Sequence, residues 1–327
     1  MTSHPIPSSS SVLVTGATGF VGRTLLTTPA PLQWRAAVRS PAVSGLRADQ
    51  VVVGDIDGQT DWSQALAGVD CVVHLAARVH VMKPTANDRV EFERTNVLGT
   101  ERLARAAAAA GVKRFVYLSS IKVNGESTGD GVFRAGDIPR PQDDYARSKL
   151  EAERRLSAIE AASGMAVAVV RSPLVYGPGV RANFLRLLSL ARSGLPIPLG
   201  SIANVRSMVS VWNLCDLICA LLQHQQRMSG VFLVADGEDV STAELVRRLA
   251  HLMHRPARLF AMPVGALRAL ASLAGRNAEL NRLCGSLAID ISETRARLDW
   301  SPPLTLDAGL RRTVQWYMQE LTARTAA

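Results

Sequence analysis

The chain has 327 residues, of which 47% are hydrophobic and 20% charged, a composition typical of a globular protein that buries a substantial core. Its net charge of +9 comes almost wholly from arginines spread along the chain, without interleaved aromatic side chains, so we expect an anionic small ligand and no nucleic acid. The four cysteines form no CxxC motif, which indicates buried thiols in a reducing cytoplasm. The longest apolar stretch, Leu259 to Ala274, is interrupted by Arg268, so we expect no membrane insertion.

Residues 1–10 are rich in serine, lack the apolar centre of a signal peptide and are expected to form a flexible leader. Short β-branched runs then alternate with helical patterns. The predicted strands cover residues 11–16, 34–39, 50–55, 71–77, 114–120 and 165–172, and the clearest helices cover 99–111 and 145–164. Strands that are apolar on both faces and separated by helices predict an α/β fold with a doubly wound parallel sheet.

The sequence changes character after Arg171, where loop-like, proline-rich and helical segments follow. One more strand, residues 230–236, is expected to rejoin the sheet. We therefore predict a dinucleotide-binding Rossmann domain over residues 11–178, with that return strand, and a smaller C-terminal lobe, mostly residues 179–327. No metal site is expected, because His251 and His254 have no third ligand near them in the sequence.

A glycine-rich turn, TGATGFVG, joins the first predicted strand to the first helix. Gly16, Gly19 and Gly22 have the GxxGxxG spacing, which allows a tight turn, close approach of a pyrophosphate and packing of helix on strand. The start of the helix offers unpaired N–H groups to the phosphates. In this position the motif predicts a dinucleotide site.

The end of the second predicted strand bears on the choice of cofactor. Arg39 and Ser40 stand where the usual NAD fingerprint places an acid for the ribose 2′-OH. A guanidinium matches a 2′-phosphate in shape and charge, so we favour NADP(H) over NAD(H). The alternative is that Arg39 stacks on adenine without choosing between the cofactors. Asp55, after the third strand, is expected to bond the adenine amine.

Tyr145 and Lys149 lie one turn apart at the start of a predicted helix. Lys149 falls on the apolar stripe of that helix, where a lysine without a partner is rare. A neighbouring ammonium favours the phenolate and lowers the pKa of a tyrosine. Ser120 ends a strand, so it lies at the carboxyl edge of the sheet, as the glycine turn does. Together these three residues predict a proton-transfer site.

These motifs resemble the extended short-chain dehydrogenases/reductases of the NAD-dependent epimerase/dehydratase family, over nearly the whole chain. The matching segments are TGATGFVG, GDI at 54–56, HLAA at 74–77, TNVLGT around Asn96, Ser120, the YxxxK pair and RSPLVYGPG at 171–179. The resemblance implies a small nucleotide-sugar lobe and hydride exchange at a sugar carbon, most often C4. It also implies that Tyr145 is the acid/base, that Lys149 orients the nicotinamide ribose and tunes Tyr145, and that Ser120 bonds the sugar oxygen.

The binding residues implied by the resemblance form two sets. The cofactor-binding set is Gly16, Thr18, Gly19, Phe20, Val21, Gly22, Arg39, Asp55, Ile56, Leu75, Ala76, Ala77, Asn96, Ser119, Tyr145, Lys149 and Pro173. The set for a UDP-sugar substrate is Ser120, Lys122, Asn183, Leu199 and Arg206, with Arg206 as a phosphate contact. Helices around residues 91–110 and 145–162 form a dimer bundle in many relatives, which implies a homodimer.

The residues after Ser120 distinguish the reactions of the family. Related sugar 4,6-dehydratases have an Asp-Glu pair there, whereas this chain has Ile121 and Lys122, so a dehydratase is not expected. The run SSIKVNGE resembles the UDP-N-acetylquinovosamine dehydrogenases. We therefore favour reduction of the C4 keto group of a UDP-4-keto-6-deoxy-N-acetylhexosamine, in surface polysaccharide synthesis. The alternative is a UDP-hexose 4-epimerase that retains NAD; a non-catalytic nucleotide-binding regulator is disfavoured by the intact Ser/Tyr/Lys set.

Overall fold

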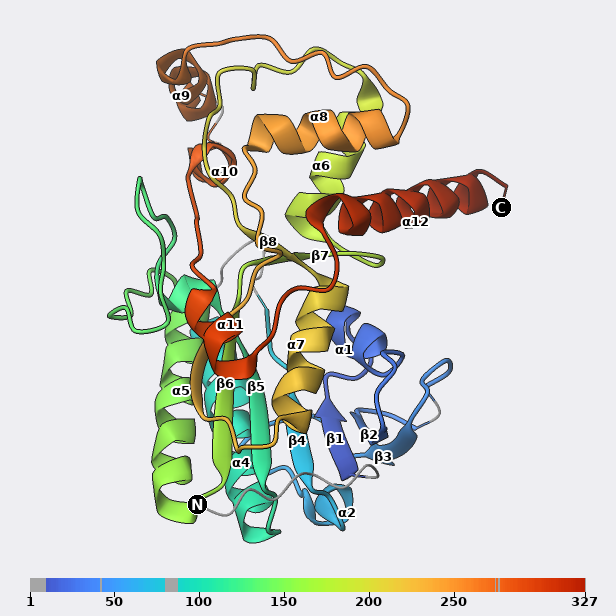
Figure 1. The fold of residues 1–327 in the computed structure, drawn as a ribbon, viewed down its shortest axis with the longest axis vertical. Coiled ribbons are helices and arrows are strands. Elements are labelled where there is room, and N and C mark those ends of the chain that lie inside the picture. Colours follow the sequence, from blue (N-terminus) through green and yellow to red (C-terminus); the bar gives the residue numbers. More distant parts are fainter. Residues whose placement is uncertain (1–9, 42, 80–87, 274, 276, 327) are drawn as a thin grey trace.

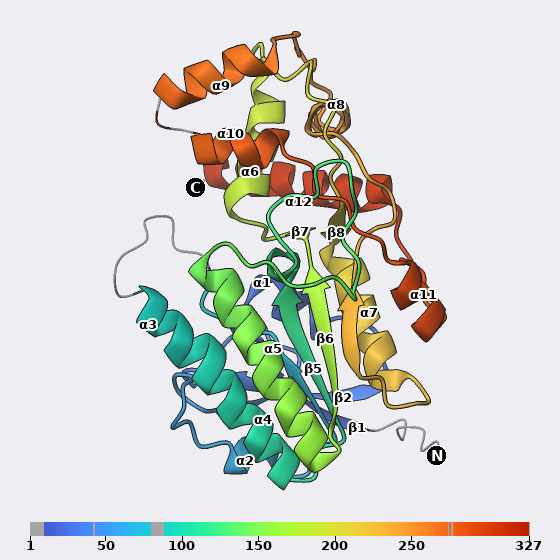
Figure 2. The same cartoon turned by 90° about the vertical axis from the view of Figure 1, so that its left-hand side faces the viewer.

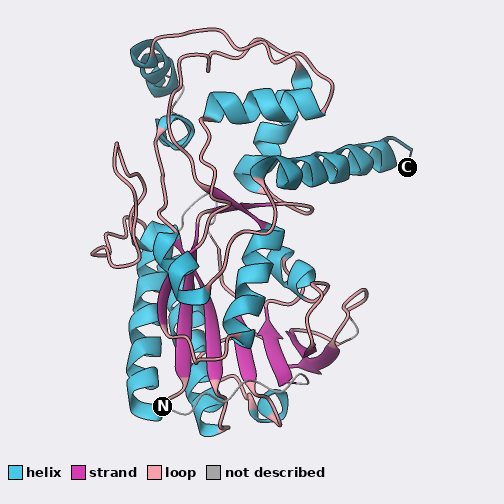
Figure 3. Ribbon diagram, in the orientation of Figure 1, coloured by secondary structure: helices cyan, strands magenta, loops and turns pink. Residues whose placement is uncertain are grey.

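The computed structural model describes residues 10–41, 43–79, 88–273, 275 and 277–326. Its centre is a seven-stranded parallel sheet with the strand order β3-β2-β1-β4-β5-β6-β9, drawn in magenta in Figure 3. The strands are β1 (Ser10–Thr15), β2 (Leu32–Val38), β3 (Asp49–Val52), β4 (Cys71–His74), β5 (Arg114–Ser120), β6 (Ala166–Ser172) and β9 (Gly230–Leu233). The predicted doubly wound α/β fold is confirmed, and the strand ends differ from the predicted ones by a few residues.

The strand order places a switch point in the middle of the sheet. From β1 the chain continues to β2 and β3 on one side, and it then returns to β4, β5 and β6 on the other side. In open α/β sheets, ligands bind beyond the carboxyl ends of the strands at such a point. The glycine turn follows β1, and Ser120 ends β5, so both lie at this edge.

Helices cover both faces of the sheet, as Figures 1 and 2 show. On one face, α1 (Phe20–Leu25) and α7 (Val211–Gln223) pack their apolar side chains against β1, β4 and β5. On the other face lie α2 (Ser63–Leu66), α4 (Gly99–Ala109) and α5 (Asp144–Ser163). Because both faces are buried, the strands read as nearly continuous apolar runs.

The helix that carries the predicted Tyr/Lys pair is well defined at both ends. The Asp143 carboxylate accepts a hydrogen bond from the amide of Ala146 at 2.7 Å, which makes Asp143 the N-cap of α5. Gly164 ends the helix with a φ of 71°, a left-handed conformation that favours glycine. Lys149 is 2% exposed, as its place on the apolar stripe predicts.

The segment before α4 is a continuous helical run with an irregular centre. α3 (Asp88–Phe92) leads into a π-helical segment, Glu93–Leu98, which leads into α4. π-helical turns of this kind are frequent at functional sites. Asn96, a predicted cofactor contact, lies in this segment and is 1% exposed.

A second core lies above the sheet in the view of Figure 1. It is formed by helices of the C-terminal half and by a two-stranded parallel sheet of β7 and β8. The elements are β7 (Leu174–Tyr176), α6 (Ala182–Ser193), β8 (Met208–Ser210), α8 (Thr242–Leu252), α9 (Val264–Leu273), α10 (Asn277–Cys284) and α12 (Leu306–Ala326). Between β8 and α8 the chain returns to the large sheet as α7 and β9, and α11 (Ser292–Leu298) hydrogen-bonds β9 through Thr294 and Leu233. The C-terminal lobe is therefore discontinuous in the sequence.

Two further expectations concern the predicted leader and the longest apolar stretch. Ser10, the last residue of the predicted leader, begins β1, and residues 1–9 lie outside the described residues. The apolar stretch that starts at Leu259 contributes the 10-residue helix α9. Within the described ranges, none of the helices has the length and apolarity required to cross a membrane.

Candidate active site

The glycine turn lies against the strand end that carries the HLAA motif. Gly16 has a φ of +69°, and a Cβ at this position would lie 2.7 Å from the backbone nitrogen of Ala76. A Cβ on Gly22 would overlap the carbonyl oxygen of Gly16. Thr18 and Gly19 remain exposed at the start of α1. The motif therefore needs glycine for both the turn and the close packing, and it leaves its outer edge open to a phosphate group.

Arg39 and Asp55, two predicted adenosine contacts, form an ion pair with each other. The distance between Arg39 Nε and Asp55 Oδ1 is 2.7 Å, and the two side chains are 81% and 61% exposed. Arg39 follows β2 and Asp55 follows β3, which are neighbours in the sheet. Because both side chains are exposed, this pair holds Arg39 only weakly and bears little on the choice between the two cofactors. Ile56 packs closely against Gly99, where a Cβ would lie 2.8 Å from the Ile56 Cγ2.

The end of β5 is joined to the start of α5 by an ion pair. Ser120 caps a short 3-10 turn, Ile121–Val123, and its hydroxyl accepts a hydrogen bond from the Lys122 amide at 3.3 Å. Lys122 Nζ lies 2.6 Å from Asp143 Oδ2. Lys122 comes two residues after Ser120 and Asp143 two residues before Tyr145, so this contact ties the segment that carries Ser120 to the start of the helix that carries Tyr145.

Tyr145 and Lys149 have pKa values displaced in opposite directions. Burial, followed by the charge of Asp143, raises the pKa of Tyr145 to about 12. Burial lowers the pKa of Lys149 to about 7, against the charge of Glu153, which raises it. We expected Lys149 to lower the pKa of Tyr145, but the shift is set by burial and by Asp143, both of which raise it. Tyr145 therefore holds its proton at neutral pH, which suits a proton donor to a sugar oxygen.

Asn96 fastens the end of the HLAA segment to α5. Its side-chain oxygen accepts a hydrogen bond from the Arg78 amide at 2.8 Å, and its side-chain nitrogen donates to the Arg78 carbonyl at 3.0 Å. The same nitrogen donates to Ser148 Oγ at 3.0 Å, and Ser148 Oγ donates to the Tyr145 carbonyl at 2.7 Å. Asn96 thus holds together two segments that we expect to contact the cofactor.

Ser119, also predicted to bind cofactor, directs its hydroxyl into a buried polar network. Its Oγ donates to Glu153 Oε1 at 2.5 Å. Arg171 binds both oxygens of Glu153, at 3.1 and 2.6 Å, and donates to Asn124 Oδ1 at 3.0 Å. Any contact of Ser119 with a cofactor is thus left to its backbone. We did not predict Glu153 or Arg171, although a carboxylate on the buried face of α5 and an arginine ending an apolar strand were available signals.

The predicted substrate cations are engaged with acidic or backbone groups. Lys122 also pairs with Glu126 at 2.8 Å. Burial alone would lower the pKa of Lys122, but its hydrogen bonds to Asp143 and Glu126 raise it. Arg206 donates to the Gly285 carbonyl at 3.2 Å, and burial lowers its pKa, with Glu126 opposing.

The other predicted residues differ in exposure. Asn183 is exposed on α6, whereas the Leu199 side chain is 4% exposed and packs in the core of the C-terminal lobe. A substrate contact at Leu199 would therefore involve its backbone. Pro173 is buried between β6 and β7. Phe20 meets the YGPG loop, because a Cβ on Gly177 would lie 3.4 Å from the Phe20 ring.

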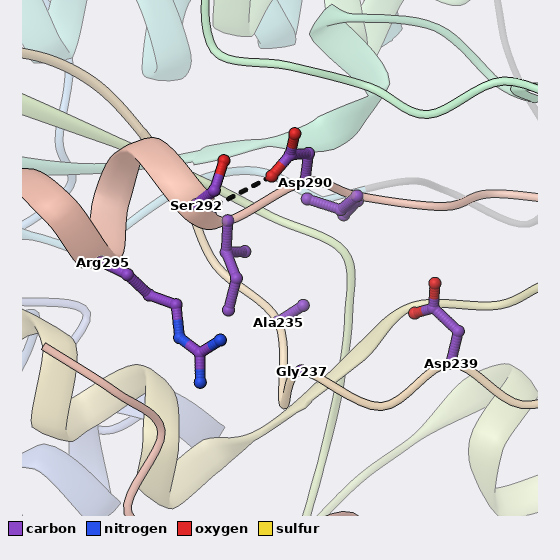
Figure 4. A pocket seen from close by; sticks show the side chains of 8 residues that line it. Ala235, Gly237, Asp239, Asp290, Ser292 and Arg295 are labelled. Atoms are coloured by element: carbon purple, nitrogen blue, oxygen red, sulfur yellow. Dashed lines mark hydrogen bonds between the residues drawn. The ribbon is translucent and has the colours of Figure 1, made fainter.

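Two cavities lie away from these residues. One, of about 230 Å³, is shown in Figure 4, and its lining residues are Ala235, Gly237, Asp239, Ile289, Asp290, Ile291, Ser292 and Arg295. The other, of about 410 Å³, lies between α6 and α12 and is lined by Gly179, Val180, Arg181, Leu185, Trp316, Tyr317, Glu320 and Leu321. None of the predicted catalytic, cofactor or substrate residues lines either cavity.

Two observations fit a nicotinamide dinucleotide at the candidate site. The glycine turn is exposed at the end of β1 and accommodates no Cβ at Gly16 or Gly22. Lys149 has no hydrogen-bond partner among the described residues, although its side chain is buried. An ammonium in that position can donate to ribose hydroxyls, and the turn can receive the pyrophosphate.

Comparison with known proteins agrees with the fold and the motifs. A family model described as the NAD dependent epimerase/dehydratase family matches residues 12–235. The chain is 44% identical to the UDP-glucose 4-epimerase of Vibrio cholerae, over 94% of this chain and 96% of that protein. It is 31% identical to a dTDP-glucose 4,6-dehydratase of Streptomyces griseus, over 94% and 93% of the two chains. Among solved structures, MoeE5 in complex with UDP-glucose and NAD has a TM-score of 0.76 and 28% identity, covering 95% of this chain and 100% of its own.

Proposed function

Because the chain belongs to the NAD-dependent epimerase/dehydratase family, we propose that it acts on a nucleotide sugar as a UDP-hexose 4-epimerase with retained NAD. The main support is its 44% identity, over nearly the full length of both chains, to a UDP-glucose 4-epimerase. The structure of MoeE5 with UDP-glucose and NAD, which is 28% identical, adds support for NAD over NADP. We therefore reverse our sequence-based order, in which a 4-ketoreductase came first.

In the proposed reaction the glycine turn and Lys149 would hold the nicotinamide cofactor, which would supply hydride exchange at C4 of the sugar. Tyr145 exchanges a proton with the C4 oxygen, and the Ser120 hydroxyl donates a hydrogen bond to the same oxygen. Lys149 places a positive charge beside the ribose and Tyr145. In the oxidation step Tyr145, as a phenolate, would take the proton of the C4 hydroxyl, and in the reduction step, as a phenol, it would return that proton to the keto oxygen; its raised pKa favours the second step.

For the UDP group we propose contacts from Arg206, Asn183 and the backbone at Leu199. Arg206 is partly buried, which strengthens its attraction for a diphosphate. Lys122 lies beside Ser120, and we propose that it contacts the sugar while paired with Asp143 and Glu126. A 4,6-dehydratase is disfavoured, because Ile121 is buried and Lys122 is a cation where that reaction needs acidic groups.

A second candidate function is the 4-ketoreductase of a UDP-4-keto-6-deoxy-N-acetylhexosamine. It is favoured by the absence of an acid at the end of β2, where Arg39 and Ser40 follow Val38. Without that acid the ribose is held less firmly, which suits a cofactor that exchanges at every turnover, NADPH in particular.

One experiment separates the two functions. The purified protein is incubated with UDP-glucose or UDP-N-acetylglucosamine without added cofactor, and in parallel with the UDP-4-keto-6-deoxy sugar and NADH or NADPH. The epimerase predicts interconversion of the UDP-hexoses at C4 in the first assay. Consumption of reduced cofactor with the keto sugar, and no epimerisation, would establish the reductase instead.

We also propose that the protein is a cytoplasmic homodimer that serves surface polysaccharide synthesis. Val90 is 60% exposed and Leu98 is 38% exposed on the helical run that leads into α4, where relatives form a dimer bundle. Large apolar side chains left in solvent on one helical run favour burial against a partner. Sedimentation analysis should give twice the mass of the chain, and Val90→Glu should shift the protein towards the monomer. A wild-type monomer at high protein concentration would refute the proposal.

A further inference from the structure

The ammonium of Lys149 is held by an aromatic ring. Lys149 Nζ lies 4.3 Å from the centroid of the Tyr117 ring, and no described residue forms a hydrogen bond with it. Both side chains are buried, with 2% exposure for Lys149 and 0% for Tyr117. A cation over an aromatic face gains most when solvent is excluded. The position of the ammonium is therefore determined by β5 as well as by its own helix.

Tyr117 contributes its ring to this contact and little through its hydroxyl. The hydroxyl oxygen is buried and has no hydrogen-bond partner among the described residues. A buried hydroxyl without a partner costs stability. The ring, by contrast, meets Lys149 on α5 and His74 on β4.

His74, the first residue of the HLAA motif, supports the ring from the side of β4. The centroid of its ring is 5.7 Å from the centroid of the Tyr117 ring, and the two ring planes differ by 18°. Its two nitrogens are 2.6 Å from Thr15 Oγ1 and 2.9 Å from Thr100 Oγ1. Thr15, His74 and Tyr117 are in register across β1, β4 and β5. Hydrogen bonds on both sides thus fix the histidine that stacks against Tyr117.

We propose that Tyr117 is a positioning residue, whose ring, stacked on His74, holds the Lys149 ammonium at the active site by a cation–π contact. The HLAA histidine is then the base of this stack. The inference deepens the proposed function, because it rests on Lys149 being part of the site.

The titratable groups that face Lys149 come from three elements. Glu153, also on α5, favours the charged form of Lys149. His74 faces Lys149 from β4, and Tyr117 faces it from β5. Tyr145 lies one turn before Lys149 on α5. Burial and the charge of Lys149 lower the pKa of His74 to about 3, so His74 stays neutral and adds no competing charge. With the pKa of Lys149 at about 7, its ammonium is present below neutral pH and is lost above it. Removal of the ring takes away an attraction for the ammonium and lowers this pKa further.

The test uses two matched variants of the full chain. Tyr117→Phe keeps the ring and removes the hydroxyl, whereas Tyr117→Leu removes the ring. The chain has only four lysines, at positions 83, 113, 122 and 149, so NMR of the protein labelled with ¹³C-lysine resolves the Lys149 Cε signal, assigned with Lys149→Met. We expect the titration midpoint of this signal to fall by about one pH unit in Tyr117→Leu and to stay unchanged in Tyr117→Phe.

Two further measurements keep the result decisive. If Tyr117→Leu fails to fold, a ring-fluorinated phenylalanine at position 117 keeps the volume but weakens the negative ring face, and it should lower the midpoint in the same direction. Equal midpoints of the Lys149 titration in all folded variants would overturn the proposal.

Turnover of Tyr117→Leu should be about tenfold below that of Tyr117→Phe at pH 8, with the difference narrowing towards pH 6. If the protein catalyses neither reaction but the midpoint falls as expected, the proposed function fails while the role of Tyr117 stands.

Discussion

At the residue scale, burial displaces the pKa values of Tyr145 and Lys149 in opposite directions. The pKa of Tyr145 is raised to about 12, and that of Lys149 is lowered to about 7, in both cases chiefly by burial. The tyrosine therefore keeps its proton near neutral pH, whereas the lysine changes its charge near neutral pH. The activity should consequently depend on pH through Lys149 before it depends on Tyr145.

The proton donor can be removed without disturbing its surroundings. Tyr145→Phe keeps the edge-to-face contact with Phe92, whose ring centroid is 6.1 Å from that of Tyr145. We expect turnover to fall by about 10²–10⁴-fold, because only the transferable proton is lost, while NAD binding by calorimetry stays unchanged. Tyr317→Phe, a buried tyrosine on α12, is the control and should keep full activity. Full turnover in Tyr145→Phe would exclude Tyr145 as the acid/base.

The glycine turn permits a test that separates backbone strain from steric overlap. Gly16 and Gly68 have nearly the same φ, +69° and +68°, but a Cβ at Gly16 meets the backbone of Ala76, whereas one at Gly68 meets nothing within 4 Å. Gly68→Ala should therefore cost only the strain of a left-handed residue, about 1–2 kcal/mol of unfolding free energy, and keep NAD binding. Gly16→Ala should cost clearly more and lose NAD binding, as measured by urea unfolding and calorimetry. Equal losses in the two variants would mean that the close packing at Gly16 carries no energetic weight.

At the element scale, α5 contacts β5 through two pairs of alternating residues. Tyr117 and Ser119 are two apart on the strand, and Lys149 and Glu153 are one turn apart on the helix, so each pair points to the other. Lys149 meets the Tyr117 ring, and Ser119 bonds Glu153. The sequence predicted the strand, the helix and the inward side of Lys149, because these follow from local periodicity. It did not predict which strand residue meets which helix residue, since that depends on how the elements pack.

The Glu153–Arg171 pair should be the most sensitive ionic contact of this helix. Both side chains are buried, and Glu153→Gln would leave the Arg171 charge without its carboxylate. We expect a loss of about 3–5 kcal/mol in unfolding free energy, measured by urea denaturation. Glu151→Gln, on the same helix, breaks only partly exposed pairs with Arg154 and Arg155 and should cost less than about 1 kcal/mol. Similar small losses in both variants would refute a special role for the buried pair.

At the scale of the whole molecule, a buried carboxylate joins the sheet to the C-terminal lobe. Asp236, just after β9, accepts hydrogen bonds from the Tyr176 hydroxyl at 2.6 Å, the Ser210 amide at 2.9 Å and the Asn213 side chain at 2.6 Å. Asn213 also exchanges hydrogen bonds with the backbone of Leu304, ahead of α12. The sequence predicted a sheet and a smaller lobe, from the change in texture after Arg171. It did not predict this junction, because its members are far apart in the chain and lie in unrelated patterns.

The junction should make the stability of the protein depend on pH in a definite direction. Burial raises the pKa of Asp236 above its unfolded value, against the hydrogen bonds from Tyr176, Ser210 and Asn213, which lower it. A group with a raised pKa contributes stability that is fully present below its unfolded pKa and is lost as the pH rises through its folded pKa. Asp236→Asn removes this dependence but keeps the size of the side chain. The free energy of unfolding of the wild type minus that of Asp236→Asn should therefore decrease as the pH rises above the unfolded pKa of 3.8, and it should level off above the folded pKa. Urea unfolding followed by tryptophan fluorescence measures this difference in free energy. A difference that increases with pH would show that the junction stabilises the ionised carboxylate.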